Sequence, residues 1–357
     1  MNQASSAQRT TDVAIAGAGI IGLSLGLELR RRGLSVIVLD RAQAMASASS
    51  AAAGMLAVHD PLNPSALLPL ALLSHRLYPG FLADIESLSN KKVPLRTRQT
   101  LQHIAPGPAT APLASPQEIA ALAPGLDPCG HTFTILDETS LDPLDLKAAI
   151  PTAFLAAGGT LLEHTELLRT ESTPDGVLLQ TSHHPIFAGL FVDCRGAWSG
   201  LAPGSLPGLP AVPVLPVKGQ MANLRCDPHL LRCAVRTPGI YLIPRGDGRV
   251  AIGSTLEHVG FDQQPQSATI QRLTEAARQL LPEAQPFNPP QTWAGLRPGT
   301  PDGLPILGPA GHPNCWYATG HYRDGILLAP ATARIVAQAM LSEPPEVSLA
   351  PFSPSRF

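Results

Sequence analysis

The stretch "DVAIAGAGIIGLSLGLELRRRGLSVIVLDR" constrains the fold of this chain more than any other. It contains an apolar strand (residues 13–16), a glycine-rich turn, an amphipathic helix and a second strand (residues 35–39). In such a turn Gly17 permits the tight bend, Gly19 lets the backbone approach a pyrophosphate, and Gly22 lets helix and strand pack closely. The spacing therefore predicts a βαβ unit that binds a dinucleotide at its helix N-terminus.

A carboxylate follows this motif at the expected distance. Asp40 lies eighteen residues after Gly22, where an acidic side chain can accept hydrogen bonds from both ribose hydroxyls. An acid here suits NAD and FAD alike, so the motif alone leaves the cofactor open. The stretch "SASSAAAGMLA" (residues 47–57) favours FAD, because small residues let the backbone pass close to a planar ligand and serines can donate to phosphate oxygens. The same alanine-rich stretch also suits an ordinary helix start.

The composition argues against several classes of partner. Charged residues make up 15% of the chain and the formal charge is -2, so a nucleic acid is not an expected partner. Apolar stretches end well short of the roughly 20 residues that span a bilayer. The first eleven residues are polar, which predicts a frayed tail, no signal peptide and a cytoplasmic protein. Five cysteines without a CxxC pair predict buried free thiols and no metal site.

The length and the order of patterns predict two interleaved domains. A chain of 357 residues exceeds the usual size of one hydrophobic core. The expected fold class is α/β (α+β), with a Rossmann-type FAD-binding domain and an interleaved substrate domain on a mixed or antiparallel sheet. Helical patterns are found at residues 66–88, 267–282 and 325–341, and residues 141–163 predict a helix that ends at Gly158-Gly159 and then a short strand. The domain boundaries are expected at 1–90, 141–208 and 300–345 for the FAD-binding domain, 91–140 and 209–299 for the substrate domain, and 346–357 for a C-terminal tail.

Seven motifs together carry a resemblance to a known family. In chain order they are "GAGIIG", "SSAAAGML", "GAWSG", "LPVKGQ", "YLIPR", "WAGLRPGTPDGLPILG" and "GHYRDGILLAPATA". Over nearly its whole length the chain resembles the D-amino-acid oxidase/sarcosine oxidase family of FAD-dependent amine oxidases. Within that family it is most similar to the glycine oxidases of thiamine biosynthesis.

The resemblance implies a set of FAD contacts along the chain. They fall in the glycine-rich turn, after the second strand, in the small-residue stretch, at one backbone position near the adenine, in "GAWSG", and in the segment that would surround the flavin. In chain order these residues are Gly17, Gly19, Ile20, Ile21, Gly22, Asp40, Arg41, Ala48, Ser49, Ala53, Gly54, Met55, Leu167, Gly196, His321, Tyr322, Arg323, Asp324, Gly325, Ile326 and Leu327. The helix that follows could direct its N-terminal dipole at the N1/O2 edge of the flavin. No Cys or His lies in an attachment motif, so non-covalent FAD is expected.

The resemblance also implies a substrate site. Arg297 corresponds to the arginine that holds the substrate carboxylate in two hydrogen bonds. Arg323 corresponds to a second arginine near flavin and substrate, and Tyr241 to a tyrosine that contacts the same carboxylate. We therefore expect Arg297, Arg323 and Tyr241 as catalytic and substrate-binding residues, with Leu256 where a family methionine closes the pocket.

Two further residues are left open by the sequence. Lys218 suits either a cation near the flavin or an exposed lysine on a turn. His321 suits contact with substrate, flavin or backbone. The family asparagine after the second arginine is Asp324 here, and a family histidine before "YLIPR" is Gly239, so the choice of amine can differ.

The implied activity is FAD-dependent oxidative deamination of glycine, sarcosine or a small D-amino acid, with O2 reduced to H2O2. In the thiamine pathway such an enzyme supplies dehydroglycine for the thiazole. An oligomer, a tetramer in many relatives, is expected by the same resemblance. Three alternatives stay open: a flavin dehydrogenase that passes electrons to a quinone or carrier, an NAD-dependent dehydrogenase, and a flavin-binding subunit without activity of its own.

Overall fold

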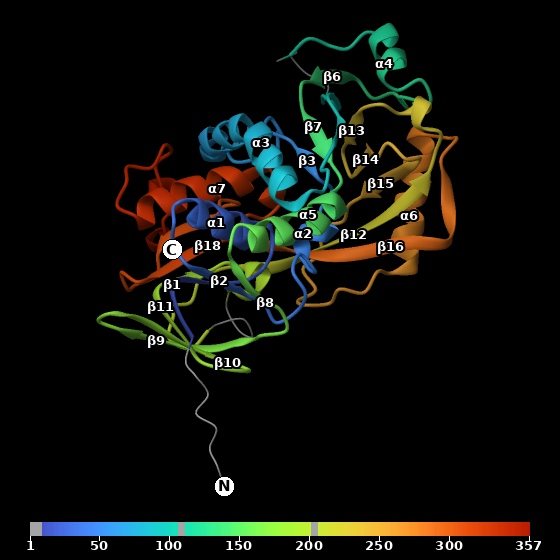
Figure 1. Ribbon diagram of the computed structural model, residues 1–357. Coiled ribbons are helices and arrows are strands. Elements are labelled where there is room, and N and C mark those ends of the chain that lie inside the picture. The colour runs from blue at the N-terminus through green and yellow to red at the C-terminus, as the bar shows by residue number, and fades with distance from the viewer. Residues whose placement is uncertain (1–8, 106–110, 201–205) are drawn as a thin grey trace.

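A computed structural model describes residues 9–105, 111–200 and 206–357 of the chain. Two large β-sheets and one small sheet are connected by helices (Figure 1). The helices are α1 (Ile20–Arg31), α2 (Ala48–Ala51), α3 (Leu68–Ser89), α4 (Pro116–Leu122), α5 (Pro143–Ala156), α6 (Ser267–Leu280) and α7 (Gly325–Met340). The strands are β1 (Arg9–Ala16), β2 (Val36–Leu39), β3 (Met55–Leu56), β4 (Leu95–Thr97), β5 (Thr100–His103), β6 (Phe133–Leu136), β7 (Thr139–Leu141), β8 (Thr160–Leu162), β9 (Leu167–Thr173), β10 (Gly176–Thr181), β11 (Ile186–Asp193), β12 (Leu215–Arg225), β13 (Ala234–Thr237), β14 (Ile240–Pro244), β15 (Arg249–Gly253), β16 (Gln285–Gly299), β17 (Ile306–Pro309) and β18 (Cys315–Thr319).

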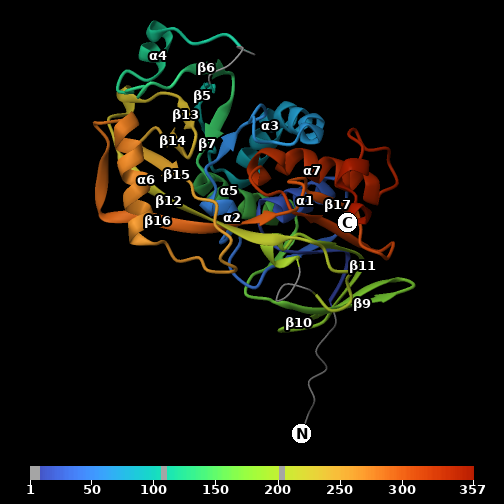
Figure 2. The ribbon, with the colours of Figure 1, turned by 180° about the vertical axis from the view of Figure 1, so that it is seen from behind.

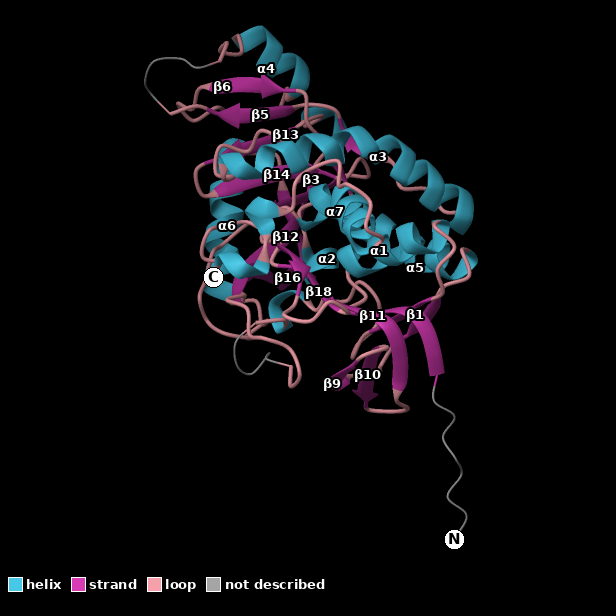
Figure 3. Ribbon diagram, turned by 90° about the vertical axis from the view of Figure 1, so that its left-hand side faces the viewer, coloured by secondary structure: helices cyan, strands magenta, loops and turns pink. Residues whose placement is uncertain are grey.

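The first sheet is built around the predicted βαβ unit. Its order is β17-β18-β11-β1-β2-β8, and the hairpin β9–β10 joins it at β11. β1 runs parallel to both β2 and β11. The residues of β1 and β2 that pair with each other are apolar on both faces of the sheet, because each face is covered. Helices α1, α3, α5 and α7 lie together on one side of this sheet (Figure 3). The Rossmann-type part of the predicted fold class is therefore confirmed.

The second sheet is mostly antiparallel. Its order is β16-β12-β15-β14-β13-β5-β6, with one parallel pair between β13 and β5. Helix α6 packs on its outer side (Figure 2). Strands β3, β7 and β4 form the small third sheet. This mixed sheet is the expected second part of the fold, and the domain boundaries drawn above stay a proposal.

Several local predictions are confirmed and others are wrong. Helices α3, α5, α6 and α7 occur where the periodicity predicts them. Residues 9–11 belong to β1 and not to a frayed tail, because Arg9 pairs with Ile186 of β11; residues 1–8 lie outside the described chain. All five cysteines are free as expected, but Cys129 is exposed and not buried. No helix among residues 9–105, 111–200 and 206–357 has the length and apolarity needed to cross a membrane.

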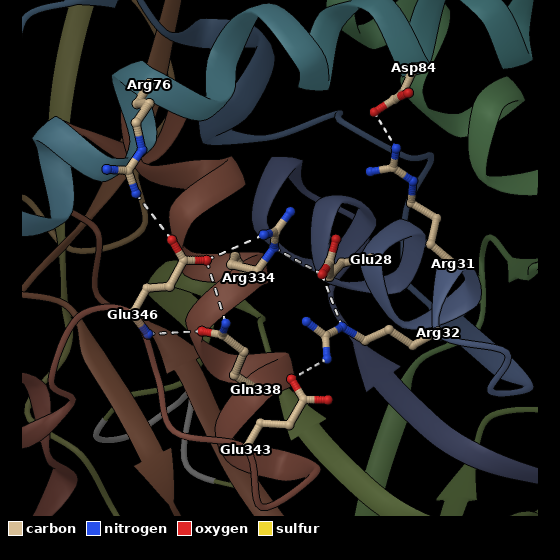
Figure 4. A network of polar contacts seen from close by, with 9 residues as sticks. All are labelled: Glu28, Arg31, Arg32, Arg76, Asp84, Arg334, Gln338, Glu343 and Glu346. Carbon is tan, nitrogen blue, oxygen red and sulfur yellow. Dashed lines mark hydrogen bonds and ion pairs between the residues drawn. The ribbon is translucent and has the colours of Figure 1, made fainter.

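An ion network on the outer side of the helices connects α1, α3, α7 and the C-terminal segment (Figure 4). Glu28 of α1 accepts ion pairs from Arg32 at 3.0 Å and from Arg334 of α7 at 3.1 Å. Glu346 pairs with Arg334 at 3.3 Å and with Arg76 of α3 at 3.1 Å. Single exposed pairs contribute at most about 1 kcal/mol, so the network matters chiefly because it joins α1 to α7.

Candidate active site

A cavity of about 870 Å³ lies between the two large sheets. Its volume is in the upper part of the range for ligand pockets, roughly 300 to 1,000 Å³. The lining includes the glycine-rich turn, α2, the N-terminus of α7 and the inner face of the second sheet. Of the predicted cofactor and substrate residues, these line the cavity: Gly17, Gly19, Ile20, Ile21, Asp40, Arg41, Ala48, Ser49, Ala53, Gly54, Met55, Leu167, Gly196, Tyr241, Leu256, Arg297, His321, Tyr322, Arg323, Asp324, Gly325 and Ile326.

Two predicted contacts do not line it. The side chain of Leu327 is buried in the hydrophobic core beneath α7, and its carbonyl accepts a hydrogen bond from Ser74. Gly22 lies behind the turn, where an added Cβ would come within 1.9 Å of the carbonyl oxygen of Gly17. Gly22 therefore serves helix packing, as the sequence predicts, and not direct contact.

The glycine-rich turn has the geometry that the motif predicts. Gly17 has a φ of +107°, and a Cβ there would lie 2.3 Å from the carbonyl oxygen of Cys194, so only glycine fits. Helix α1 begins at Ile20 with Gly19 as its N-cap, and glycine has no side chain to cap it. The Ile20 N–H donates to the Ser49 hydroxyl at 2.9 Å. The open N-terminus of α1 at the cavity wall suits a negatively charged group.

Asp40 and Arg41 form the wall beyond this turn. The Asp40 carboxylate accepts the N–H groups of Ala18 at 2.8 Å and Ala42 at 2.9 Å, and burial raises its pKa. The guanidinium of Arg41 stacks on the ring of Trp198, 4.2 Å from its centroid. Asp40 thus orders the backbone of the turn, and hydrogen bonding of this carboxylate to a ribose stays a prediction.

The segment 321–326 forms a further part of the cavity wall. Helix α7 starts at Gly325, and no described side chain caps its N-terminus, which opens into the cavity. The Nε2 atom of His321 is 3.0 Å from the Thr332 hydroxyl, and burial lowers the pKa of His321 to about 3. His321 is therefore a neutral ring held by α7 at neutral pH.

Arg297 and Tyr241 both line the cavity on the inner face of the second sheet. The guanidinium of Arg297 reaches across β12 and donates to the Ser254 hydroxyl at 2.5 Å and to the Thr255 carbonyl at 3.1 Å. The Tyr241 hydroxyl lies beside the adjacent Gly253, 2.9 Å from where a Cβ would be. Both partners of the Arg297 guanidinium in the described chain are neutral, so its charge can be matched by an anionic ligand.

Arg323 lines the cavity but is already paired. Its Nη2 lies 3.0 Å from a carboxylate oxygen of Asp60, a residue that the sequence reasoning missed. The neighbouring Asp324 accepts a hydrogen bond from Asn63 at 3.1 Å. Burial raises the pKa of Asp324 to about 6, and the nearby Asp60 adds to the increase.

Lys218 is not an exposed lysine on a turn, and it does not line the cavity. Its side chain is fully buried, and its Nζ donates to Asp262 and to the Gln264 carbonyl, each at 2.6 Å. Side chains alternate along a strand, and Gly219 lines the cavity. Lys218 therefore points to the other face of β12, away from the cavity.

The Asp324 environment predicts a pH-dependent stability difference. A carboxyl whose folded pKa rises from 3.8 to about 6 stabilises the fold below pH 4, and this contribution is lost as the pH rises through 6. Raising the pH from 4 to 8 should therefore lower the free energy of unfolding of the native protein by about 1–3 kcal/mol more than that of Asp324→Asn. Denaturant unfolding of both proteins at both pH values measures this change. An equal difference at the two pH values would contradict the burial argument.

Comparison with known proteins places the chain in a family. The profile of the FAD dependent oxidoreductase family matches residues 12–339, and the chain belongs to this family. It is 33% identical to the glycine oxidase of Pseudomonas aeruginosa, over 96% of this chain and 98% of that protein. It is 34% identical to the bifunctional protein ThiO/ThiG of Synechocystis, covering 98% of this chain and 54% of that protein. The crystal structure of glycine oxidase from Geobacillus kaustophilus superposes with a TM-score of 0.90 at 30% identity, covering 98% of this chain and all of that one.

These findings confirm the predicted family, the resemblance to glycine oxidases, the oxidoreductase class and FAD as cofactor. The cavity fits such a group by its own geometry. Helices α1 and α7 both open their N-termini into it, which suits a pyrophosphate and an electron-rich ring edge. Gly17 and Gly54 line the cavity as bare backbone, because a Cβ at either position would collide with the carbonyl of Cys194 or Leu141.

Proposed function

We propose that the protein oxidises the α-amine of glycine, sarcosine or a small D-amino acid to an imine, with O2 as acceptor and H2O2 as product. The observation that carries this proposal is the guanidinium of Arg297, whose hydrogen-bond partners in the described chain are neutral and which lines the same cavity as Tyr241. The relatives named glycine oxidase and ThiO/ThiG support the choice of amine and a role in supplying dehydroglycine for thiamine thiazole synthesis.

The protein's own residues bind and orient the substrate. Arg297 holds the carboxylate in two hydrogen bonds and Tyr241 adds a third, so that Cα and the amine are fixed against the flavin side of the cavity. Bound FAD supplies the two-electron oxidation of the C–N bond. His321 is neutral and contributes no charge. Arg323, which Asp60 neutralises, is assigned to orientation of the segment 321–326 and not to the carboxylate.

Peroxide and oxygen assays of the FAD-loaded protein test the proposal. The panel is glycine, sarcosine, D-alanine and D-proline, with L-alanine and L-proline as stereochemical controls. Turnover with equal oxygen loss and peroxide gain, led by glycine or sarcosine, is expected. Turnover only with an added quinone or dye would identify a dehydrogenase. A protein that retains FAD and oxidises none of these amines would exclude the proposed activity.

Gly219 provides a sharper test of the carboxylate site. A Cβ at this position would lie 2.3–2.5 Å from the guanidinium atoms of Arg297. Those atoms are the end of a flexible side chain, so Gly219→Ala should displace them without unfolding the protein. We expect the KM for glycine to rise about tenfold, a loss of about 1.4 kcal/mol, with little change in Tm. Gly80→Ala on α3, where an added Cβ meets open space, is the control and should leave KM unchanged. An unchanged KM in Gly219→Ala would contradict this placement of Arg297.

A further inference from the structure

We propose that Asp60 restricts the substrate to amines with a single carboxylate by keeping a second anionic group out of the cavity. This inference rests on the proposed function and specifies its substrate class. Asp60 lines the cavity in the segment after β3, and its side chain is 8% exposed. Its carboxylate lies 3.0 Å from Nη2 of Arg323 and 4.0 Å from Nη1 of Arg236. One carboxylate thus stands between two guanidinium groups.

Arg236 lies next to Tyr241, the tyrosine that is proposed to bind the substrate. It pairs directly with Tyr241 across the antiparallel strands β13 and β14, so the two side chains share the inner face of the sheet. Arg236 donates to Gln102 and Glu138, each at 2.7 Å, and its side chain is more than nine-tenths buried. Its Nη1 makes no hydrogen bond in the described chain, and Asp60 is the carboxylate that this nitrogen faces.

The strand order places Asp60 on one side of Tyr241, called here the free side because the Arg297 guanidinium lies on the other. β14 lies between β15 and β13. The Arg297 guanidinium occupies the β15 side, through Ser254, and Arg236 occupies the β13 side. A substrate held by its carboxylate at Arg297 therefore has its remaining substituents toward Arg236 and Asp60.

The charged groups on that free side leave no net positive charge that could bind a second anionic group. Two guanidinium groups, Arg236 and Arg323, face three buried carboxyl groups, Asp60, Glu138 and Asp324. The sum is negative when Asp324 is ionised and zero when it is protonated. A second substrate carboxylate would meet like charge in a poorly solvated cavity, which is strongly unfavourable. Removing the charge of Asp60 raises the sum by one and frees Arg323.

The test compares sarcosine with iminodiacetate, which differ by one carboxylate on the nitrogen substituent. In the FAD-loaded enzyme, Asp60→Asn should raise the ratio of kcat/KM for iminodiacetate to that for sarcosine at least tenfold. Asp60→Glu, which keeps the charge, should restore the native ratio. Asp84→Asn removes an equal charge on the outer side of α3, where Asp84 pairs with Arg31 (Figure 4), and should leave the ratio unchanged. If Asp60 had a purely structural role, Asp60→Asn would lower kcat/KM for both substrates by the same factor.

A binding measurement separates this inference from the proposed activity, because it requires no turnover. Acetate and malonate are titrated into the native FAD-loaded protein and followed by the perturbation of flavin absorbance. Malonate should bind at least tenfold more weakly than acetate, and Asp60→Asn should reduce that gap. Equal binding of the two by the native protein, or an unchanged substrate ratio in Asp60→Asn, would overturn the inference. Absence of all amine oxidation would defeat the proposed function alone, because the binding comparison would still decide the role of Asp60.

Discussion

Arg297→Ala is expected to raise the KM for glycine or sarcosine at least about thirtyfold, with a loss of roughly 2 to 5 kcal/mol in transition-state binding. The guanidinium makes hydrogen bonds only to the neutral Ser254 and Thr255 within the described chain. Its removal therefore breaks no ion pair of the fold, and the loss falls on the ligand. The measurement is steady-state kinetics on protein with full FAD content.

Arg297→Lys separates charge from geometry in the same assay. Lysine keeps the positive charge but cannot hold a carboxylate through two parallel hydrogen bonds. We expect a KM between those of the native protein and Arg297→Ala. Identical KM values for all three proteins would place the carboxylate elsewhere in the cavity.

Gly22→Ala is expected to weaken FAD binding at least a hundredfold, the second large effect. A Cβ at this position would lie 1.9 Å from the Gly17 carbonyl oxygen, a backbone atom that cannot move without opening the turn. The N-terminus of α1 would then shift from the site where a pyrophosphate is expected. Quenching of FAD fluorescence on titration with apoprotein measures the dissociation constant.

Ser24→Ala, on the same helix, is the matched control for that experiment. Ser24 is buried, and its hydroxyl has no hydrogen-bond partner in the described chain. Its loss should leave FAD affinity unchanged and cost no stability. Normal FAD affinity in Gly22→Ala would show that the close contact with Gly17 is not required for binding.

The features that the sequence predicted well are those set by local backbone chemistry. The order strand, glycine turn and helix fixes Gly22 by sterics within a few residues and Gly17 by its positive φ, so spacing alone is informative. Helical periodicity located α6 and α7 for the same reason. The placement of Arg297 and Tyr241 in one cavity needed the family resemblance, because β14 and β16 are brought together only through two intervening strands.

The features that the sequence did not predict depend on distant charge pairs. Asp60 meets Arg323 across 263 positions of the chain, and no local pattern encodes that contact. Lys218 was misplaced because a lysine beside a glycine resembles a turn, whereas it lies within β12. Strand alternation from Gly219 would have assigned it to the outer face. Ser49 was expected to donate to phosphate, and the structure adds that it accepts the Ile20 N–H.

Anaerobic mixing of the FAD-loaded protein with glycine and sarcosine tests the central claim most directly. The account predicts that one of these amines bleaches the flavin absorbance band in the native protein and does so far more slowly in Arg297→Ala at equal concentration. Admission of O2 should then restore the band with one equivalent of peroxide. A flavin that stays oxidised with both amines, in protein that dithionite still reduces, would contradict the claim.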